Sequence, residues 1–129
     1  RVSQDSAYRE IIEPAHARGM GVFAAMLLMY GMLTGEDPNE IVKRRGIKVQ
    51  QRDLQLACDV REWAMQREIP MLALALQYCT NDPRISSTLV GASSPDQIIA
   101  DVKAIEIPIR DEDWRELNEK FGIPIRWLQ

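Results

Sequence analysis

Two runs of strand length, the apolar residues 20–25 and the segment 85–90, constrain the fold of this chain more than any other feature. Each run stands next to segments with helical periodicity, so the runs predict buried parallel strands joined by helical crossovers. This order of elements is typical of α/β proteins. Two strands cannot form a sheet that hides both of its faces. We therefore expect further strands, from elsewhere or from a second copy of the chain, to cover them.

Helical segments lie between and beside the two predicted strands. Residues 5–18 carry apolar side chains at helical spacing, with Pro14 placed either to kink the helix or to begin its second part, and Gly19 placed to end it. Residues 52–67 predict an amphipathic helix, because one broad face is apolar. Pro70 fits the first turn of the next helix, which residues 81–83, Asn-Asp-Pro, are expected to end.

The remaining segments are a long loop and two more helices. Turn residues and charges in residues 36–51 predict a surface loop with one helical turn at 39–45. The last two helices are expected over 97–105, with Ile98, Ile99 and Val102 inward, and from Asp111 as the cap to Gly122, with Trp114 and Leu117 buried.

Residues 85–98 predict a strand, a glycine-containing loop and the start of a helix, an order that builds an anion site. Gly91 lets the backbone approach a ligand closely, and Ser93 or Ser94 can both cap the helix and contact the ligand. The unpaired N–H groups and the positive end of the helix dipole favour a phosphate. A helix start without a ligand is the alternative interpretation.

This segment, together with residues 73–78, resembles the C-terminal part of the aldo-keto reductase family, and within it the L-galactose dehydrogenase-like branch. Residues 16–25 and 31–35 are similar to the segments around the seventh barrel strand of that family. The resemblance implies an α/β fold, the C-terminal portion of a (β/α)8 TIM barrel with about two parallel strands and surrounding helices, over residues 1–129. A complete barrel takes about 250 residues.

The resemblance also implies an activity, namely hydride transfer between NADP or NAD and an aldose, an aldehyde or a related carbonyl or alcohol. The Asp, Tyr, Lys and His of the family lie in the earlier half of the barrel, so no catalytic residue is expected here. We expect His16 at the surface, Tyr30 in the core of its loop, and Lys48 and Lys103 in solvent.

On the cofactor side, the family's Ser-Pro stretch is replaced by Met26 and Leu27, so only backbone contacts with the pyrophosphate and ribose carry over to the loop that follows. Where family members hold the adenine with Glu-Asn, this chain has Ala100 and Asp101. No basic residue follows the serine pair closely, so NAD and NADP both stay open. The cofactor residues implied by the resemblance are Leu28, Gly31, Gly91, Ser93, Ser94, Gln97 and Asp101.

The composition of the chain argues against several classes of binding partner. The net charge is −3 and the basic residues are scattered, which argues against nucleic acid. No apolar run reaches the roughly 18 to 20 residues of a membrane span, and no signal peptide is recognised, so the sequence predicts a soluble, cytoplasmic protein. Cys58 and Cys79 stand without a CxxC motif, which favours reduced, buried thiols over a metal site.

Two hypotheses follow. In the first, the chain is the C-terminal, cofactor-side part of an NAD(P)-dependent oxidoreductase that needs the missing N-terminal half of the barrel. In the second, it is a non-catalytic remnant of a reductase, a binding or assembly module that self-associates through its exposed strands. The replaced residues Met26, Leu27, Ala100 and Asp101 motivate the second.

Overall fold

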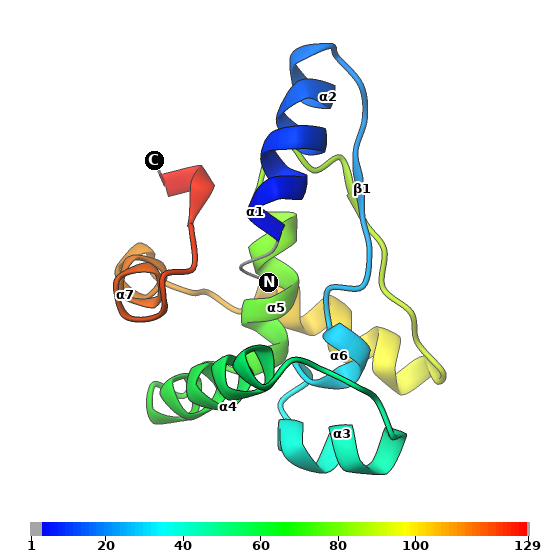
Figure 1. The fold of residues 1–129 in the computed structure, drawn as a ribbon, viewed down its shortest axis with the longest axis vertical. Helices are drawn as coiled ribbons and strands as arrows, with labels where there is room; N and C mark the ends of the chain where they lie inside the picture. Colours follow the sequence, from blue (N-terminus) through cyan, green and yellow to red (C-terminus); the bar gives the residue numbers. More distant parts are fainter. Residues whose placement is uncertain (1–3, 129) are drawn as a thin grey trace.

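The computed structural model describes residues 4–128, which form a helix-rich α/β unit around a small sheet (Figure 1). Both strands run toward the end of the molecule at which α3 lies and α6 begins, the lower end in Figure 1. In chain order the elements are α1 (Gln4–Ala7), the π-helix η1 (Tyr8–Ile12), α2 (Glu13–Ala17), β1 (Phe23–Ala24), the 3-10 turn η2 (Met29–Gly31), α3 (Pro38–Arg45), α4 (Gln51–Gln66), α5 (Met71–Thr80), β2 (Ser87–Thr88), α6 (Pro95–Glu106), α7 (Asp111–Phe121) and the 3-10 turn η3 (Arg126–Leu128).

The first three segments make one helix with a widened turn, which confirms the effect expected of Pro14. A proline has no N–H and its ring crowds the carbonyl four residues back. The chain avoids that clash by opening a π turn ahead of Pro14, in which the N–H of Glu13 donates to the carbonyl of Tyr8. Gly19, with φ of 70°, then ends the helix in the left-handed conformation, as predicted.

The two strands form a parallel pair in which Phe23 lies opposite Ser87 and Ala24 opposite Thr88. Regular pairing covers two residues of each strand, fewer than the apolar runs predict. One further backbone bond extends the pairing on the carboxyl side, from the N–H of Leu89 to the carbonyl of Ala24 at 2.8 Å. The two strands are parallel and are connected through helices, as predicted.

The prediction that both strands are buried is wrong within the described residues. The side chain of Phe23 is 69% exposed, and Leu89 is also exposed. Helix α5 contacts β2, but among residues 4–128 nothing covers the opposite face of the sheet. The apolar character of the strands thus exceeds what this chain alone can bury.

Packing among the helices is concentrated in three clusters. The largest joins α4, α5 and α7 through Trp63, Leu74 and Trp114. A second cluster holds α3 against α4 around Met32, Ile41 and Leu54, and a third joins α5 to α6. The predicted buried face of the helix over residues 52–67 is confirmed, since Leu54, Ala57, Val60, Trp63 and Ala64 are all buried, while Leu56 is half-buried.

Three predictions about the helices need correction. Residues 38–45 form a helix of two turns, α3, because Asp37 accepts a hydrogen bond from the N–H of Asn39 and Gly46 closes the other end in the left-handed conformation. Asp111 is the first residue of α7, and the capping position is Arg110. On α6, the side chains expected inward are half exposed, and Ala104 is the residue that packs against α5.

The C-terminal segment packs against the helices, not over the strands. Trp127 makes edge-to-face contacts with Trp114 and Tyr78, at centroid distances of 5.1 and 5.6 Å. The hydroxyl of Tyr78 donates to the carbonyl of Pro124 at 2.8 Å. In Figure 1 this segment lies on the side of α5 away from the strands. None of the helices within residues 4–128 has the length and apolar character that crossing a bilayer requires.

Candidate functional site

The loop that leads from β2 into α6 has the predicted form of a capped helix start. Ser94 is extended and its hydroxyl accepts the N–H of Gln97 at 3.3 Å, while Pro95 occupies the first helical position. The side chain of Gln97 returns toward the loop, and its Oε1 accepts both the N–H of Ser93, at 2.7 Å, and its hydroxyl, at 3.1 Å. The four residues therefore form one reciprocal capping arrangement.

Ahead of this cap lie donors with space beside them. Within residues 4–128, the N–H groups of Gly91 and Ala92 donate to no backbone carbonyl. A Cβ built on Gly91 would meet no heavy atom within 4 Å, and its φ lies outside the left-handed region. Gly91 is thus not required by a turn, but it leaves the backbone open to a ligand. Together with the positive end of α6, these groups offer a place for an anion.

The loop after β1 is tightly bonded to itself. The carbonyl of Leu28 accepts the N–H of Gly31 at 2.8 Å and that of Leu33 at 3.2 Å. The carbonyl of Gly31 accepts the hydroxyl of Thr34 at 2.8 Å. These backbone groups of the two candidate residues are engaged within the loop, so a ligand would meet this segment through its remaining groups.

Backbone strain marks the same loop. Met26, Met29 and Tyr30 have φ values of 58°, 44° and 59°, in the left-handed region that non-glycine residues seldom occupy. Each such residue costs about 1 to 2 kcal/mol. Tyr30 is 55% exposed, so its expected place in the core of the loop is wrong. Leu28, from the same loop, packs against a buried cluster of the helices.

The structure brings the two candidate loops onto one support. Leu28, from the loop after β1, and Val90, from the loop after β2, pack against the same buried cluster of Ala73, Leu76 and Ala104. The candidate residues therefore gather at the carboxyl end of the parallel strands, where α/β proteins bind ligands. Asp101 lies one turn beyond Gln97 on α6, and burial raises the pKa of its carboxyl group.

The other residues that sequence analysis singled out lie outside this site. His16 is exposed near the end of α2, and Lys48 and Lys103 are exposed, as expected. Cys58 and Cys79 are free but only partly buried. Among the described residues, no group of three His, Cys, Asp or Glu side chains is placed to hold a metal ion.

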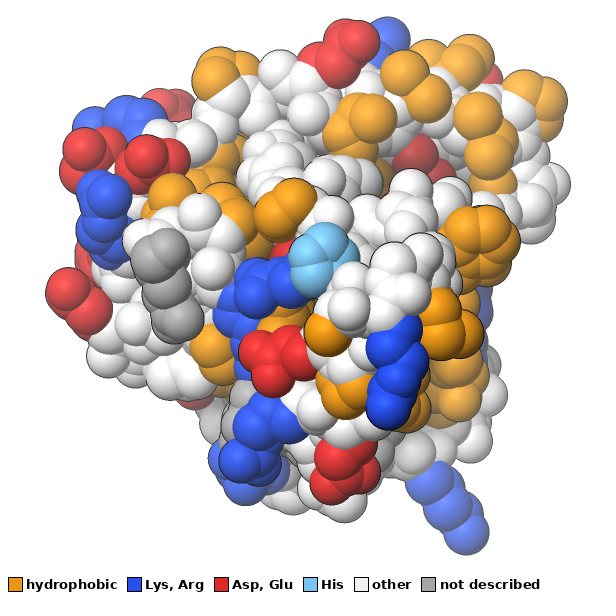
Figure 2. All heavy atoms as spheres, turned by 90° about the horizontal axis from the view of Figure 1, so that it is seen from above, with side chains coloured by type: hydrophobic (Ala, Val, Ile, Leu, Met, Phe, Trp, Pro, Cys, Tyr) orange, Lys and Arg blue, Asp and Glu red, His pale blue; other side chains and the backbone are white. Residues whose placement is uncertain are grey.

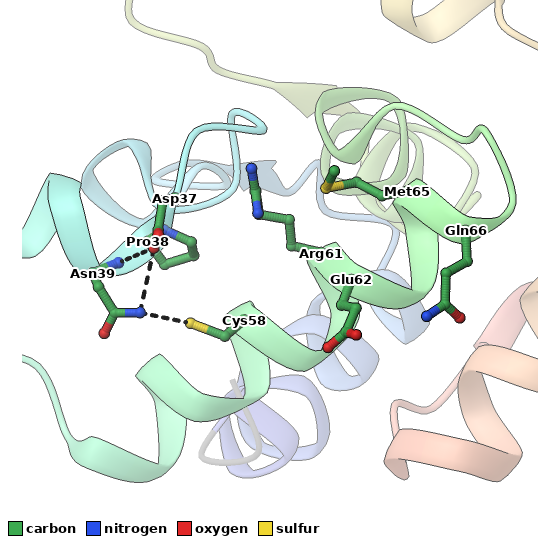
Figure 3. A pocket seen from close by; sticks show the side chains of 8 residues that line it. All are labelled: Asp37, Pro38, Asn39, Cys58, Arg61, Glu62, Met65 and Gln66. Atoms are coloured by element: carbon green, nitrogen blue, oxygen red, sulfur yellow. Dashed lines mark hydrogen bonds between the residues drawn. The ribbon is translucent and has the colours of Figure 1, made fainter.

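A groove that the sequence did not predict lies between α3 and α4, with a volume of about 540 Å³ (Figure 3). In it the amide of Asn39 donates to Asp37 and to the sulfur of Cys58, the latter at 3.3 Å. Burial, with the nearby Asp37, raises the pKa of the Cys58 thiol. The groove contains none of the candidate residues of the two loops.

A buried polar cluster at the amino end of the strands was also missed. The hydroxyl of Tyr8 donates to Asp82 at 3.0 Å, and Asp82 also accepts from the guanidinium of Arg84 at 2.9 Å. The guanidinium of Arg126 lies 3.7 Å from the centre of the Tyr8 ring. Burial by itself would raise the pKa of Asp82, but the hydrogen bonds from Arg84 and Tyr8 outweigh it and lower that pKa. Since 74 residues separate Tyr8 from Asp82, no local pattern reveals the pair.

Comparison with known proteins identifies a family that the chain matches over most of its length. The model described as the aldo/keto reductase family matches residues 2–121. The L-glyceraldehyde 3-phosphate reductases of Escherichia coli O157:H7 and of Escherichia coli strain K12 are 31% and 30% identical over 108 residues. Each match covers 74% of this chain and 31% of the relative, so the chain spans less than a third of the length of these curated relatives. The match of nearly the whole chain shows that it belongs to the aldo/keto reductase family.

Proposed function

We propose that this chain is the C-terminal, cofactor-side part of an NAD(P)-dependent oxidoreductase that interconverts a carbonyl and an alcohol, with its catalytic groups outside these 129 residues. The observation that carries the proposal is the donor group at the start of α6. Gly91 and Ala92 present N–H groups with open space beside them, and Ser93 adds a hydroxyl, at the positive end of a helix of 12 residues. This arrangement suits the phosphate of a nucleotide.

The residues present fit such a cofactor. Gly91 and Ser93 would contact the adenosine phosphate, and Ser94 keeps the helix start rigid through its bond to Gln97. Gln97 would release the N–H and hydroxyl of Ser93 when a phosphate oxygen takes its place, because a charged acceptor forms the stronger bond. The half-buried Asp101 would lie toward the adenine. When bound, the nicotinamide cofactor supplies or accepts the hydride.

The proposed contribution of the loop after β1 is smaller. Leu28 and Gly31 would border the pyrophosphate and ribose through the backbone, but part of that backbone is already bonded within the loop. The positive φ values of Met29 and Tyr30 give the loop strain that rearrangement around a ligand would relieve. We expect its contacts to matter less than those of the start of α6.

For the substrate we propose an aldose, an aldehyde or a related small carbonyl compound, in keeping with the resemblance to the L-galactose dehydrogenase-like branch. The two relatives above carry names that specify a phosphorylated aldehyde, L-glyceraldehyde 3-phosphate. A sugar-derived aldehyde is the substrate class that the resemblance and the names of the two relatives have in common. The cofactor is proposed as NADP or NAD, because the exposed loop between Ser93 and Gln97 contains no cation to select the 2′-phosphate.

A second candidate function is a binding or assembly module derived from a reductase. The bonds from Ser93 to Gln97 favour it, since they already satisfy two of the donors that a phosphate would need. The exposure of Phe23 favours it too, since a module that self-associates needs an uncovered surface.

Titration of the purified chain with NADPH and NADH, followed by nucleotide fluorescence, tests the first candidate. We expect saturable binding that weakens severalfold in Ser93→Ala and is unchanged in Lys48→Ala, a substitution at an exposed position outside both candidate loops. No binding up to millimolar nucleotide would mean that the site is incomplete without the missing strands or has been lost, and would favour the assembly module. Equal effects of the two substitutions would contradict a cofactor site at α6.

A further inference from the structure

The last turn of α3 places a cation beside the loop after β1. The buried face of α3 carries Pro38 and Ile41, and Arg45 lies four residues after Ile41 on the same face. The Cζ and Nη2 atoms of Arg45 are 3.8 and 3.9 Å from the position that a Cβ on Gly31 would occupy. Because Gly31 has no side chain, the guanidinium lies close to the backbone of a candidate cofactor residue.

Arg45 has no acidic partner, in contrast to other arginines of the chain. Its neighbour Arg44 pairs with Glu36 at 3.0 Å, and Arg84 pairs with Asp82 at 2.9 Å. On the face drawn in Figure 2, several Lys and Arg side chains likewise lie beside acidic side chains. Within residues 4–128, the side chain of Arg45 is exposed and forms neither an ion pair nor a hydrogen bond. Its charge and its planar set of donors are therefore available to an anion.

The end of the helix alone does not explain where this guanidinium lies. Lys43, Arg44 and Arg45 are all in the last turn of α3, where a cation complements the negative end of the helix dipole. That effect requires charge near the last carbonyl groups of the helix, and the first two residues already supply it. It does not require a side chain beside the loop after β1, so the approach of Arg45 to Gly31 needs another explanation.

The loop after β1 has few donors of its own for an anion. The N–H groups of Gly31, Met32 and Leu33 all donate to carbonyl groups within the loop. Met26 stands where the resemblance implies a serine, so a hydroxyl is missing as well. A phosphate over this loop would therefore need a donor from another element, and Arg45 is a basic side chain that the structure places beside it.

We propose that Arg45 binds a phosphate group beside Gly31 and replaces the donors that the loop after β1 lacks. A guanidinium can form two parallel hydrogen bonds with phosphate oxygens, which suits this role. That the phosphate belongs to a nucleotide rests on the proposed function. It is then the pyrophosphate of either cofactor or the 2′-phosphate of NADP. Leu28 and Val90 pack against one cluster, so this contact and the start of α6 lie at the same end of the strands.

Titration of the full chain with inorganic pyrophosphate at low ionic strength, followed by the NMR signals of the arginine Nε–H groups, tests the contact directly. We expect the signal of Arg45 to shift saturably, and the affinity to fall about fivefold in Arg45→Gln. Arg45→Lys, which keeps the charge without the planar donors, should recover part of the loss. Arg44→Gln removes the same charge one residue away and is the matched control, with an expected loss below about twofold.

Titrations with NADH and NADPH identify the source of the phosphate. Equal losses of affinity for both nucleotides in Arg45→Gln assign the pyrophosphate, and a loss confined to NADPH assigns the 2′-phosphate. Since Arg45 is exposed, circular dichroism of the variant is expected to match that of the unsubstituted chain.

The outcomes separate this inference from the proposed function. No shift of the Arg45 signal up to millimolar pyrophosphate, or equal losses in Arg45→Gln and Arg44→Gln, would overturn the inference, because every residue that it uses is present in the chain. Nucleotide binding that shifts the amide signals of Gly91 and Ser93 but not the Arg45 signal would also overturn it and leave the proposed function standing. Pyrophosphate binding at Arg45 without binding of either nucleotide would support the contact and favour the assembly module.

Discussion

Replacing Tyr8 with phenylalanine tests how the amino end of the sheet is held together. The substitution keeps the ring and removes the hydrogen bond to Asp82, both of whose partners are buried. A bond to a charged partner contributes about 1.5 to 3 kcal/mol. Asp82 keeps its bond to Arg84, so we expect a loss of about 2 kcal/mol in the free energy of unfolding at pH 7.

The size of this loss is expected to depend on pH. Burial, and then the hydrogen bond and the charge of Asp82, raise the pKa of Tyr8 to about 12 from its ordinary value of 10.0. The unfolded chain therefore releases the phenolic proton first as pH rises. The stabilisation is complete below pH 10 and is lost toward pH 12, at about 1.4 kcal/mol per pH unit. The difference between the chain and Tyr8→Phe should shrink to near zero over that range.

Urea unfolding followed by tryptophan fluorescence between pH 7 and 12 measures the effect, with Trp63 and Trp114 as buried reporters. Burial raises the pKa of Cys79 to about 11, but that contribution is common to both proteins and cancels in the difference. Tyr30→Phe, at an exposed tyrosine, is expected to change nothing. A difference that stays constant from pH 8 to 12, or a loss below about 0.5 kcal/mol at pH 7, would refute the reasoning.

Four further substitutions separate stability from binding. Gly91→Ala should leave the melting temperature unchanged, because its Cβ meets open space, and weaken nucleotide binding severalfold in the fluorescence titration. Gly122→Ala should do the reverse, with about 1 kcal/mol lost in urea unfolding because φ is 67°, and equal losses of affinity in both variants would contradict the assignment. Ser94→Ala removes the cap of α6 and should cost about 1 kcal/mol by chemical denaturation, together with some affinity. Trp127→Ala should cost about 1 to 3 kcal/mol through the lost contact with Trp114, and an unchanged unfolding midpoint would show that the C-terminal segment is not held there.

Local patterns sufficed for the elements that pack within the chain. The bounds of helix α4 were predicted almost to the residue. Its apolar face, which the periodicity identifies, packs against α5 and α7 of the same chain. The helix α3 was predicted too short, although its signals, Asp37 with Pro38 at the start and Gly46 at the end, are local. The turn residues and charges of residues 36–51 favour a loop, and they outweigh the two capping signals when the sequence alone is read. The helix also contains few apolar residues, so its periodicity is weak.

The error on α6 has a different cause. The helical periodicity predicts that Ile98, Ile99 and Val102 form the inward face. In the structure, the side that packs on α5 carries the small Ala104. Hydrophobic periodicity identifies a face that is buried in the complete fold, and does not say whether the covering element belongs to the same chain. The strand at Phe23 misled for the same reason. In both cases the apolar side chains are exposed within the described residues.

The cofactor residues illustrate the same division between local and long-range information. The cap at Ser94 and the placement of Ser93 beside it follow from the sequence, and the structure contains both. The return of Gln97 to the donors of Ser93 depends on a side-chain torsion that no pattern specifies. That Leu28 and Val90 share one supporting cluster depends on the parallel register of the strands, which is set across more than sixty residues.

The two ends of the sheet differ in how completely they are bonded. At the amino end, Tyr8, Asp82 and Arg84 satisfy one another, and Arg126 ties the C-terminal segment to them. At the carboxyl end, the loop around Met29 is strained, and the N–H groups of Gly91 and Ala92 donate to no backbone carbonyl within residues 4–128. A fold that stabilises one end of parallel strands and leaves strain and open donors at the other has the polarity of barrel enzymes, whose ligands bind at the carboxyl end. The strained residues and the donors without backbone partners therefore lie at the end of the strands where the proposed cofactor would bind.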